Sequence, residues 1–98
     1  MFVILTSRPG QYRTEPGEAC RVCETYEYVF CGQIKAEFAI AEQLRAARVR
    51  VVDEAPPQKV NEIPSRLLPH FDTIEAARAQ LESLTRSGTL DIALRRVS

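Results

Sequence analysis

Residues 25–40 read TYEYVFCGQIKAEFAI, and this stretch decides the fold because apolar residues alternate with polar ones on both sides of Gly32. Such alternation is typical of half-buried strands, and a glycine between two of them marks a tight turn. The sequence therefore predicts a β-hairpin. The side chains expected on its buried face are Tyr26, Tyr28 and Phe30 in the first strand, and Ile34, Ala36, Phe38 and Ile40 in the second.

A helix is the alternative for the second half of this stretch. Residues 36–47, AEFAIAEQLRAA, are rich in strong helix formers, and a helix would group Ile34, Phe38, Ala41 and Leu44 on one face. Glu37 would intrude on that face. The strand is favoured because its alternation is cleaner than the helical stripe.

Two further strands are expected on either side of the hairpin. Residues 2–7, FVILTS, are apolar on both parities, which is typical of a strand that is covered on both faces. Residues 48–52, RVRVV, alternate between arginine and valine, with Arg48 and Arg50 expected to point outward. The Ala-Pro-Pro that follows ends this strand, because proline cannot continue its hydrogen-bonded ladder. Between these strands, residues 8–17 contain two Pro-Gly pairs and are expected to form a surface loop.

The C-terminal half predicts one helix and one more strand. Residues 55–70 contain four prolines and are expected to form an extended connection on the surface. A helix is expected over about residues 73–86, with Asp72 as its N-cap, Glu75 completing a capping box and Gly88 ending it. A last strand is expected within residues 89–97. Its buried parity would hold Leu90, Ile92 and Leu94.

Together these elements predict a single α+β domain spanning residues 1–98. We expect a small, mainly antiparallel sheet of about five strands with the helix packed on one face. Thirteen basic residues balance thirteen acidic ones, so the overall charge does not favour nucleic acid as a partner. The first apolar run is too short to span a membrane, and no membrane association is expected.

All three cysteines lie within residues 20–31, CRVCETYEYVFC. With His70, they are the only sulfur and nitrogen ligands for a zinc site. If residues 24–31 form one strand, Cys31 lies about 26 Å from Cys23, too far to share a metal ion. The acidic neighbours of Cys20 and Cys23 do not stabilise a thiolate. We therefore expect no metal, no cofactor, reduced thiols and a cytoplasmic location.

The sequence offers few candidate site residues. His70 is the only histidine and a weak candidate for a catalytic base, because no nucleophile or orienting carboxylate is placed beside it by the sequence. A ligand or partner surface is the better-supported expectation. Its candidate residues are Tyr26, Tyr28, Phe30, Arg48 and Arg50.

These patterns favour a small, non-catalytic cytoplasmic interaction or accessory module of bacterial type. Residues 2–5, FVIL, present two apolar faces while the expected helix covers only one, so we expect self-association as a homodimer through sheet and aromatic surface. The alternative is a small α+β enzyme, a ligand-binding protein or an accessory subunit of a redox or oxygenase system. Its pocket would lie between the sheet, residues 8–17 and residues 55–70, near His70, Tyr26 and Tyr28.

Overall fold

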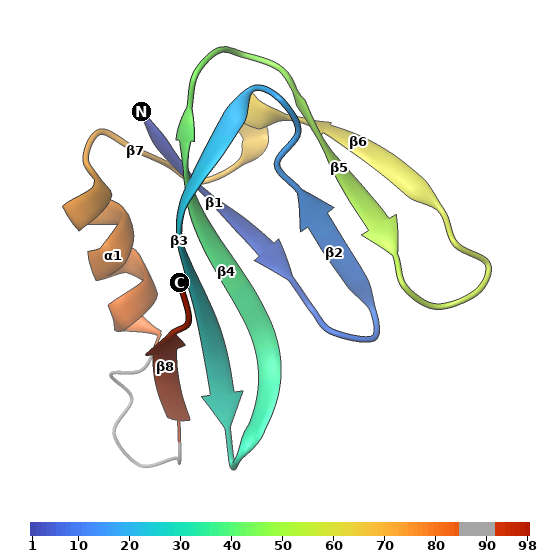
Figure 1. Ribbon diagram of the computed structural model, residues 1–98, viewed down its shortest axis with the longest axis vertical. Helices are drawn as coiled ribbons and strands as arrows, with labels where there is room; N and C mark the ends of the chain where they lie inside the picture. Colours follow the sequence, from blue (N-terminus) through green and yellow to red (C-terminus); the bar gives the residue numbers. More distant parts are fainter. Residues whose placement is uncertain (85–91) are drawn as a thin grey trace.

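The computed structural model describes residues 1–84 and 92–98, and these form an α+β fold as predicted (Figure 1). A five-stranded antiparallel sheet has the order β7-β1-β4-β3-β8, and a three-stranded antiparallel sheet has the order β2-β5-β6. The strands are β1 (Phe2–Ser7), β2 (Tyr12–Glu15), β3 (Cys20–Phe30), β4 (Gln33–Gln43), β5 (Arg48–Asp53), β6 (Val60–Pro64), β7 (His70–Phe71) and β8 (Ile92–Arg96). The helices are the 3-10 helix η1 (Ser65–Leu67) and the α-helix α1 (Ile74–Ser83).

The hairpin predicted at residues 25–40 is confirmed as β3 and β4, which are longer than expected. They are joined by a two-residue turn in which both Cys31 (φ 49°) and Gly32 (φ 78°) have positive φ, the conformation that matches the twist of paired strands. The helical alternative for residues 33–46 is wrong. Because β4 pairs with β1 on one side and β3 on the other, its hydrogen-bonded ladders outweigh the helical preference of its alanines.

A β-bulge at Cys23 explains how β3 serves two cores. Val22 pairs with Ala41 and Glu24 pairs with Ile40, which leaves Cys23 as the extra residue. The extra residue reverses the face on which even-numbered side chains lie. Cys20 therefore points to one side of the sheet and Tyr26 to the other.

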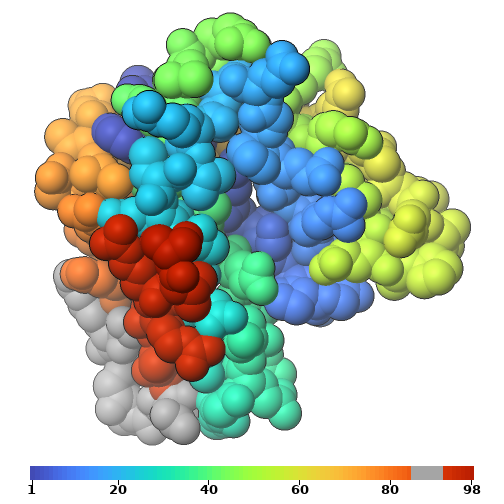
Figure 2. All heavy atoms as spheres, viewed as in Figure 1, coloured from blue at the N-terminus to red at the C-terminus, as the bar shows by residue number. Residues whose placement is uncertain are grey.

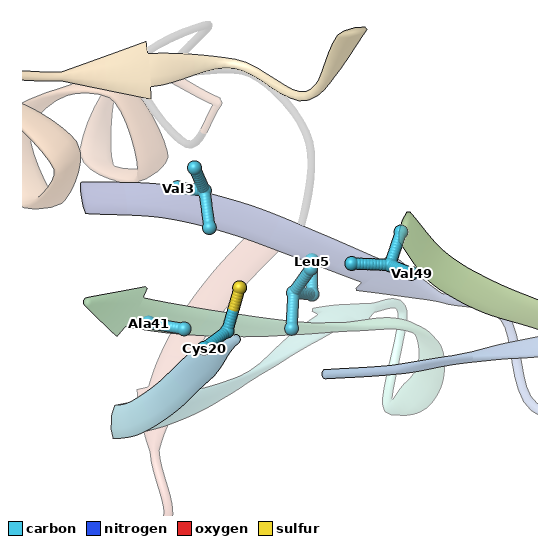
Figure 3. Packing of buried hydrophobic residues seen from close by; sticks show 5 residues of the cluster. All are labelled: Val3, Leu5, Cys20, Ala41 and Val49. Atoms are coloured by element: carbon cyan, nitrogen blue, oxygen red, sulfur yellow. The ribbon is translucent and has the colours of Figure 1, made fainter. Parts of the chain in front are cut away.

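Each face of the five-stranded sheet has its own hydrophobic core. On one face Ile4 and Ile40 pack with Ala77 and Leu81 of α1. On the other face Val49 of β5 points toward Leu5 of β1, and Cys20 lies beside them (Figure 3). The strand at residues 2–7 is therefore covered on both faces as predicted, by the helix on one side and by the three-stranded sheet on the other.

The three-stranded sheet corrects three expectations. Residues 8–17 are not simply a loop, because they contain β2, and residues 55–70 are not only an extended connection, because they contain β6, η1 and the start of β7. The strand predicted at residues 48–52 is present as β5 but belongs to this second sheet. Because β5 brings Val49 onto the face of β1 that had no expected cover, the argument that a second copy must cover that face no longer holds.

The predicted helix is present, but its N-cap is Thr73 and the expectation of Asp72 is wrong. The Thr73 hydroxyl accepts a hydrogen bond from the backbone N–H of Ala76 at 3.1 Å, so Glu75 is not in position to complete a capping box. Asp72 lies in the bend between β7 and the cap. The predicted end of the helix at Gly88 lies outside the described residues.

Replacing Thr73 with alanine is expected to lower the free energy of unfolding by about 1 kcal/mol, because the N–H of Ala76 loses its acceptor. Urea denaturation of the variant measures this loss. Asp72→Ala is the matched control and should change stability by less than half as much. A larger loss from Asp72→Ala than from Thr73→Ala would contradict the observed cap.

The last strand, β8, pairs with β3 at the edge of the larger sheet. Beyond it, the N–H of Val97 donates to the carbonyl of Thr25 at 2.9 Å, so the C-terminal residues continue along β3. Figure 2 shows this segment, in red, on the surface, while β5 and β6, in yellow-green, form the other side of the view. Within residues 1–84 and 92–98, no helix has the length and apolar character needed to cross a membrane.

Candidate binding sites

The three cysteines occupy three different environments. Cys20 is 7% exposed in the core between the sheets, where burial raises the pKa of its thiol. Cys23 is exposed at the bulge and Cys31 is exposed in the hairpin turn, at opposite ends of β3. None of the three is in a disulfide. Among the residues that the structure describes, no group of three or more histidine, cysteine or acidic side chains is arranged to hold a metal ion.

Glu24 is a buried carboxylate that joins three elements. Its side chain is 4% exposed and accepts hydrogen bonds from Arg78 Nε at 2.9 Å and from the Tyr26 hydroxyl at 2.7 Å. Arg78 Nη2 also pairs with it, and Arg96 Nη1 lies 3.4 Å from its Oε2. Since Arg78 belongs to α1 and Arg96 to β8, this carboxylate ties the helix and the edge strand to β3.

The hydrogen bonds from Arg78 lower the pKa of Glu24 from 4.5 to about 2, against the opposing effect of burial. Burial and the hydrogen bond to Glu24 raise the pKa of Tyr26, so its hydroxyl stays protonated. Tyr26, Arg78 and Arg96 also line a hollow of about 460 Å³ together with Glu82. Because both arginines pair with Glu24 and a second carboxylate lines the hollow, these charges favour neither anions nor cations. We interpret the Glu24 cluster as structural.

Tyr28 contributes to an open groove on the helix side of the sheet. Its ring meets Phe38 edge to face, with centroids 6.3 Å apart and an interplanar angle of 87°. Together with Leu84, which is 39% exposed, these rings form the apolar part of a hollow of about 420 Å³. We call this the aromatic groove; its lining residues are Arg8, Tyr28, Lys35, Ala36, Phe38 and Leu84.

His70 is held by a chain of hydrogen bonds that runs from the five-stranded sheet to η1 and to the segment between β4 and β5. Its Nε2 lies 2.9 Å from Gln43 Oε1, and because an amide oxygen only accepts, Nε2 donates. Gln43 Nε2 in turn donates to the hydroxyl of Ser65 at 2.9 Å. Ser65, which is 1% exposed, also accepts from the N–H of Ala47 at 3.1 Å. This network fixes the His70 ring but places no nucleophile against it.

His70 also lines a hollow of about 480 Å³ with two arginines, Arg48 at the start of β5 and Arg66 in η1. We call it the arginine hollow. No acidic side chain of the described residues lines it. Its lining residues are Met1, Gln43, Ala46, Ala47, Arg48, Pro64, Ser65, Arg66 and His70.

The structure brings some of the predicted site residues together and separates others. His70 and Arg48 share the arginine hollow, whereas Arg50 lies apart from it and pairs with Glu15 at 3.9 Å. Tyr28 lines the aromatic groove and Tyr26 belongs to the Glu24 cluster. A single pocket that joins His70 to the two tyrosines is therefore not formed.

A hollow does lie where the alternative interpretation expected one, between β1, β2 and the proline-rich segment. It has a volume of about 280 Å³ and is lined in part by Thr14, Val51 and Ile63. Neither His70 nor Tyr26 nor Tyr28 lines it. A second bulge in the β3–β4 pairing, between Tyr28 and Val29, places Ile34 off the aromatic side, where it is 40% exposed.

Sequence reasoning missed the partners that complete these sites. Gln43 and Ser65 are 22 residues apart, and Glu24 and Arg78 are 54 apart, so no local pattern joins them. One signal was present: Glu24 shares the parity of Tyr26 and Tyr28, and a carboxylate on an aromatic face needs a buried partner.

Comparison with known proteins gives no relative from which a role could be taken. No family model, no curated protein and no solved structure matches the chain. The function is therefore inferred from the geometry of the aromatic groove and the arginine hollow.

Proposed function

We propose that this chain is a small, non-catalytic interaction module that binds a segment of another protein through the aromatic groove. The observation that carries the proposal is the partial exposure of three apolar side chains in one hollow, those of Tyr28, Phe38 and Leu84. A half-buried cluster of aromatic and aliphatic side chains is the usual centre of a protein–protein contact. The volume of the groove, about 420 Å³, exceeds that of one large apolar side chain.

The charges at the groove indicate the kind of segment that fits. Arg8 and Lys35 are exposed and line it, and within residues 1–84 and 92–98 no acidic side chain does. Arg8 forms no ion pair with any residue in the described ranges, unlike most of the arginines there. An apolar side chain flanked by Asp or Glu would meet the rings and both cations at once. We therefore commit to an acidic, apolar peptide segment as the occupant.

A catalytic role has less support from the same geometry. The hydrogen bonds of His70 go to Gln43, whose amide separates it from Ser65, and Ser65 is almost completely buried. A base and a nucleophile that act together need direct hydrogen-bond contact. The three free thiols are consistent with a reducing compartment, and we include a cytoplasmic location in the proposal.

The groove predicts that charge reversal will weaken binding. Peptides selected from a phage-display library of random sequences should carry an aromatic or branched apolar residue next to Asp or Glu. Lys35→Glu and Arg8→Glu should each weaken a selected peptide about tenfold, because each replaces attraction by repulsion at an exposed position. Leu84→Ser should weaken it by a similar factor. Fluorescence anisotropy with a labelled peptide measures these affinities.

Lys59→Glu is the matched control, since Lys59 is exposed on the loop before β6 and outside the groove. It should leave the affinity unchanged. If the library yields no consensus, or if Lys59→Glu weakens binding as much as Lys35→Glu, the groove is not the binding site and the proposal fails.

Self-association remains the alternative use of the same surface. A second copy would have to bury more than about 1,000 Å² in total for a stable dimer. Analytical ultracentrifugation over a micromolar dilution series tests this. If the protein is a dimer and Leu84→Ser converts it to a monomer, a second copy of the chain occupies the groove. If the measured mass is that of a monomer at every concentration, the occupant is a segment of another protein.

A further inference from the structure

We infer that the arginine hollow is a second binding site, for a small organic molecule that carries a phosphate or carboxylate group. The inference is independent of the aromatic groove, which shares no lining residue with this hollow. It begins from an imbalance in the ion pairs. Of the ten arginines within residues 1–84 and 92–98, seven form ion pairs. Two of the remaining three, Arg48 and Arg66, line the arginine hollow.

The positive charges in this hollow have no neutralising partner among the described residues. Arg48 and Arg66 are exposed, and they come from β5 and from η1. In the part of the chain that the structure describes, no carboxylate lines the hollow with them, whereas Glu82 lines the hollow beside Tyr26. Two guanidinium groups that converge on one space without a carboxylate are suited to hold the oxygens of a phosphate or carboxylate.

The floor of the hollow is fixed by buried polar groups. Ser65 lies at its base, 1% exposed, with its hydroxyl accepting from both Gln43 and the backbone of Ala47. The N–H of Ser65 donates to the carbonyl of Ala47 at 2.7 Å, which ties η1 to the segment between β4 and β5. Because Arg66 follows Ser65 and Arg48 follows Ala47, the hydrogen bonds between Ser65 and Ala47 also set the backbone spacing of the two arginines. The hollow is therefore pre-formed.

The size and the remaining lining indicate an organic ligand. The volume of about 480 Å³ is within the range of small-molecule sites and exceeds the volume of one inorganic phosphate. Ala46 and Pro64 give part of the wall an apolar character. His70 also lines the hollow, and its ring orientation is set by the hydrogen bond to Gln43. Phenyl phosphate and benzoate therefore serve as probes that combine each anion with an apolar ring, and inorganic phosphate serves as the anion alone.

The test is a titration of the ¹⁵N-labelled chain with each probe at low ionic strength, followed by two-dimensional NMR. Saturable shifts are expected at the backbone amides of Ala47 and Arg66 and at the side-chain amide of Gln43. Phenyl phosphate should bind more tightly than inorganic phosphate because of its ring. Comparing phenyl phosphate with benzoate then distinguishes a phosphate site from a carboxylate site. Arg48→Gln and Arg66→Gln should each weaken binding about tenfold or more, since each removes a charge-assisted hydrogen bond.

Arg50→Gln is the matched control. Arg50 is on the same strand as Arg48 but pairs with Glu15 and lies outside the hollow. It should change the affinity by less than about twofold. Equal weakening by Arg50→Gln and Arg48→Gln would show diffuse attraction to a basic strand, and the absence of saturable shifts with all three probes would show that the hollow binds no such anion. Either result overturns the inference.

Discussion

Ile40→Ala is expected to lower the free energy of unfolding by about 3 kcal/mol, within the range measured for large-to-small changes in protein cores. Ile40 is completely buried in β4, between Ile4 of β1 and Glu24 of β3 in the pairing. Its side chain packs in the cluster that includes Leu81 of α1. Strands on both sides and the helix above prevent the structure from closing around the lost atoms, so a cavity remains.

Urea denaturation followed by circular dichroism measures this loss, with Ile34→Ala as the matched control. Ile34 is the same residue type on the same strand but is 40% exposed. Its replacement should cost less than about 1 kcal/mol, because little apolar area is removed from contact. Similar losses for the two variants would show that Ile40 is not at the centre of the helix-side core.

Glu24→Gln is expected to destabilise the protein by about 3 kcal/mol at neutral pH. The pKa of Glu24 falls from 4.5 to about 2 in the folded protein. The folded protein therefore stabilises the charged form of Glu24 by about this amount relative to the neutral form. Glutamine keeps the size of the side chain and can still accept hydrogen bonds from Arg78 and Tyr26. It removes the charge and replaces one acceptor oxygen with an amide NH2 group, so Arg78 and Arg96 lose the carboxylate that they share.

The pH dependence of this loss distinguishes charge from packing. The unfolded chain binds a proton at Glu24 more readily than the folded chain, because the folded pKa is the lower one. The stabilisation is therefore complete above pH 4.5 and disappears as the pH falls toward about 2. The difference in unfolding free energy between the two proteins should shrink accordingly between pH 5 and pH 2, measured by urea denaturation at a series of pH values.

Glu42→Gln provides the comparison for an exposed pair. Glu42 accepts from Arg21 Nη2 at 2.6 Å, but its side chain is 32% exposed and that of Arg21 is 70% exposed. Its loss should be below about 1 kcal/mol, as for other ion pairs in contact with water. If the loss from Glu24→Gln is the same at pH 3 and pH 7, it arises from packing, and the low pKa of Glu24 is wrong.

Local pattern was sufficient for elements whose own residues carry a period. The β3–β4 hairpin follows from alternation, the strand at residues 2–7 from an apolar run on both parities, and the helix after Phe71 from a helical stripe. The structure confirms each of them. Each of these segments can be recognised from its own residues, because every buried face requires apolar side chains whatever element covers it. The short strands β2 and β6 have no such period, since each has at most partly buried side chains, and sequence reasoning assigned them to loops.

The sites were less accessible to sequence reasoning than the fold. Arg48 and His70 were candidates, but nothing local showed that they share a hollow or that Arg66 joins them. Arg50 looked equivalent to Arg48 by parity, yet a nearby Glu15 on β2 pairs with it. Only the pairing of β2 with β5 places that carboxylate there.

The sequence by itself determined an α+β domain with a central antiparallel hairpin, one helix and a first strand that is apolar on both faces. Only the tertiary structure decided what covers the second face. It is covered by β5 within a three-stranded sheet of the same chain, because Val49 and Leu5 meet once β2 and β6 flank β5. Periodicity reports which side of an element is buried, whereas the identity of the covering element depends on contacts between residues far apart in the chain.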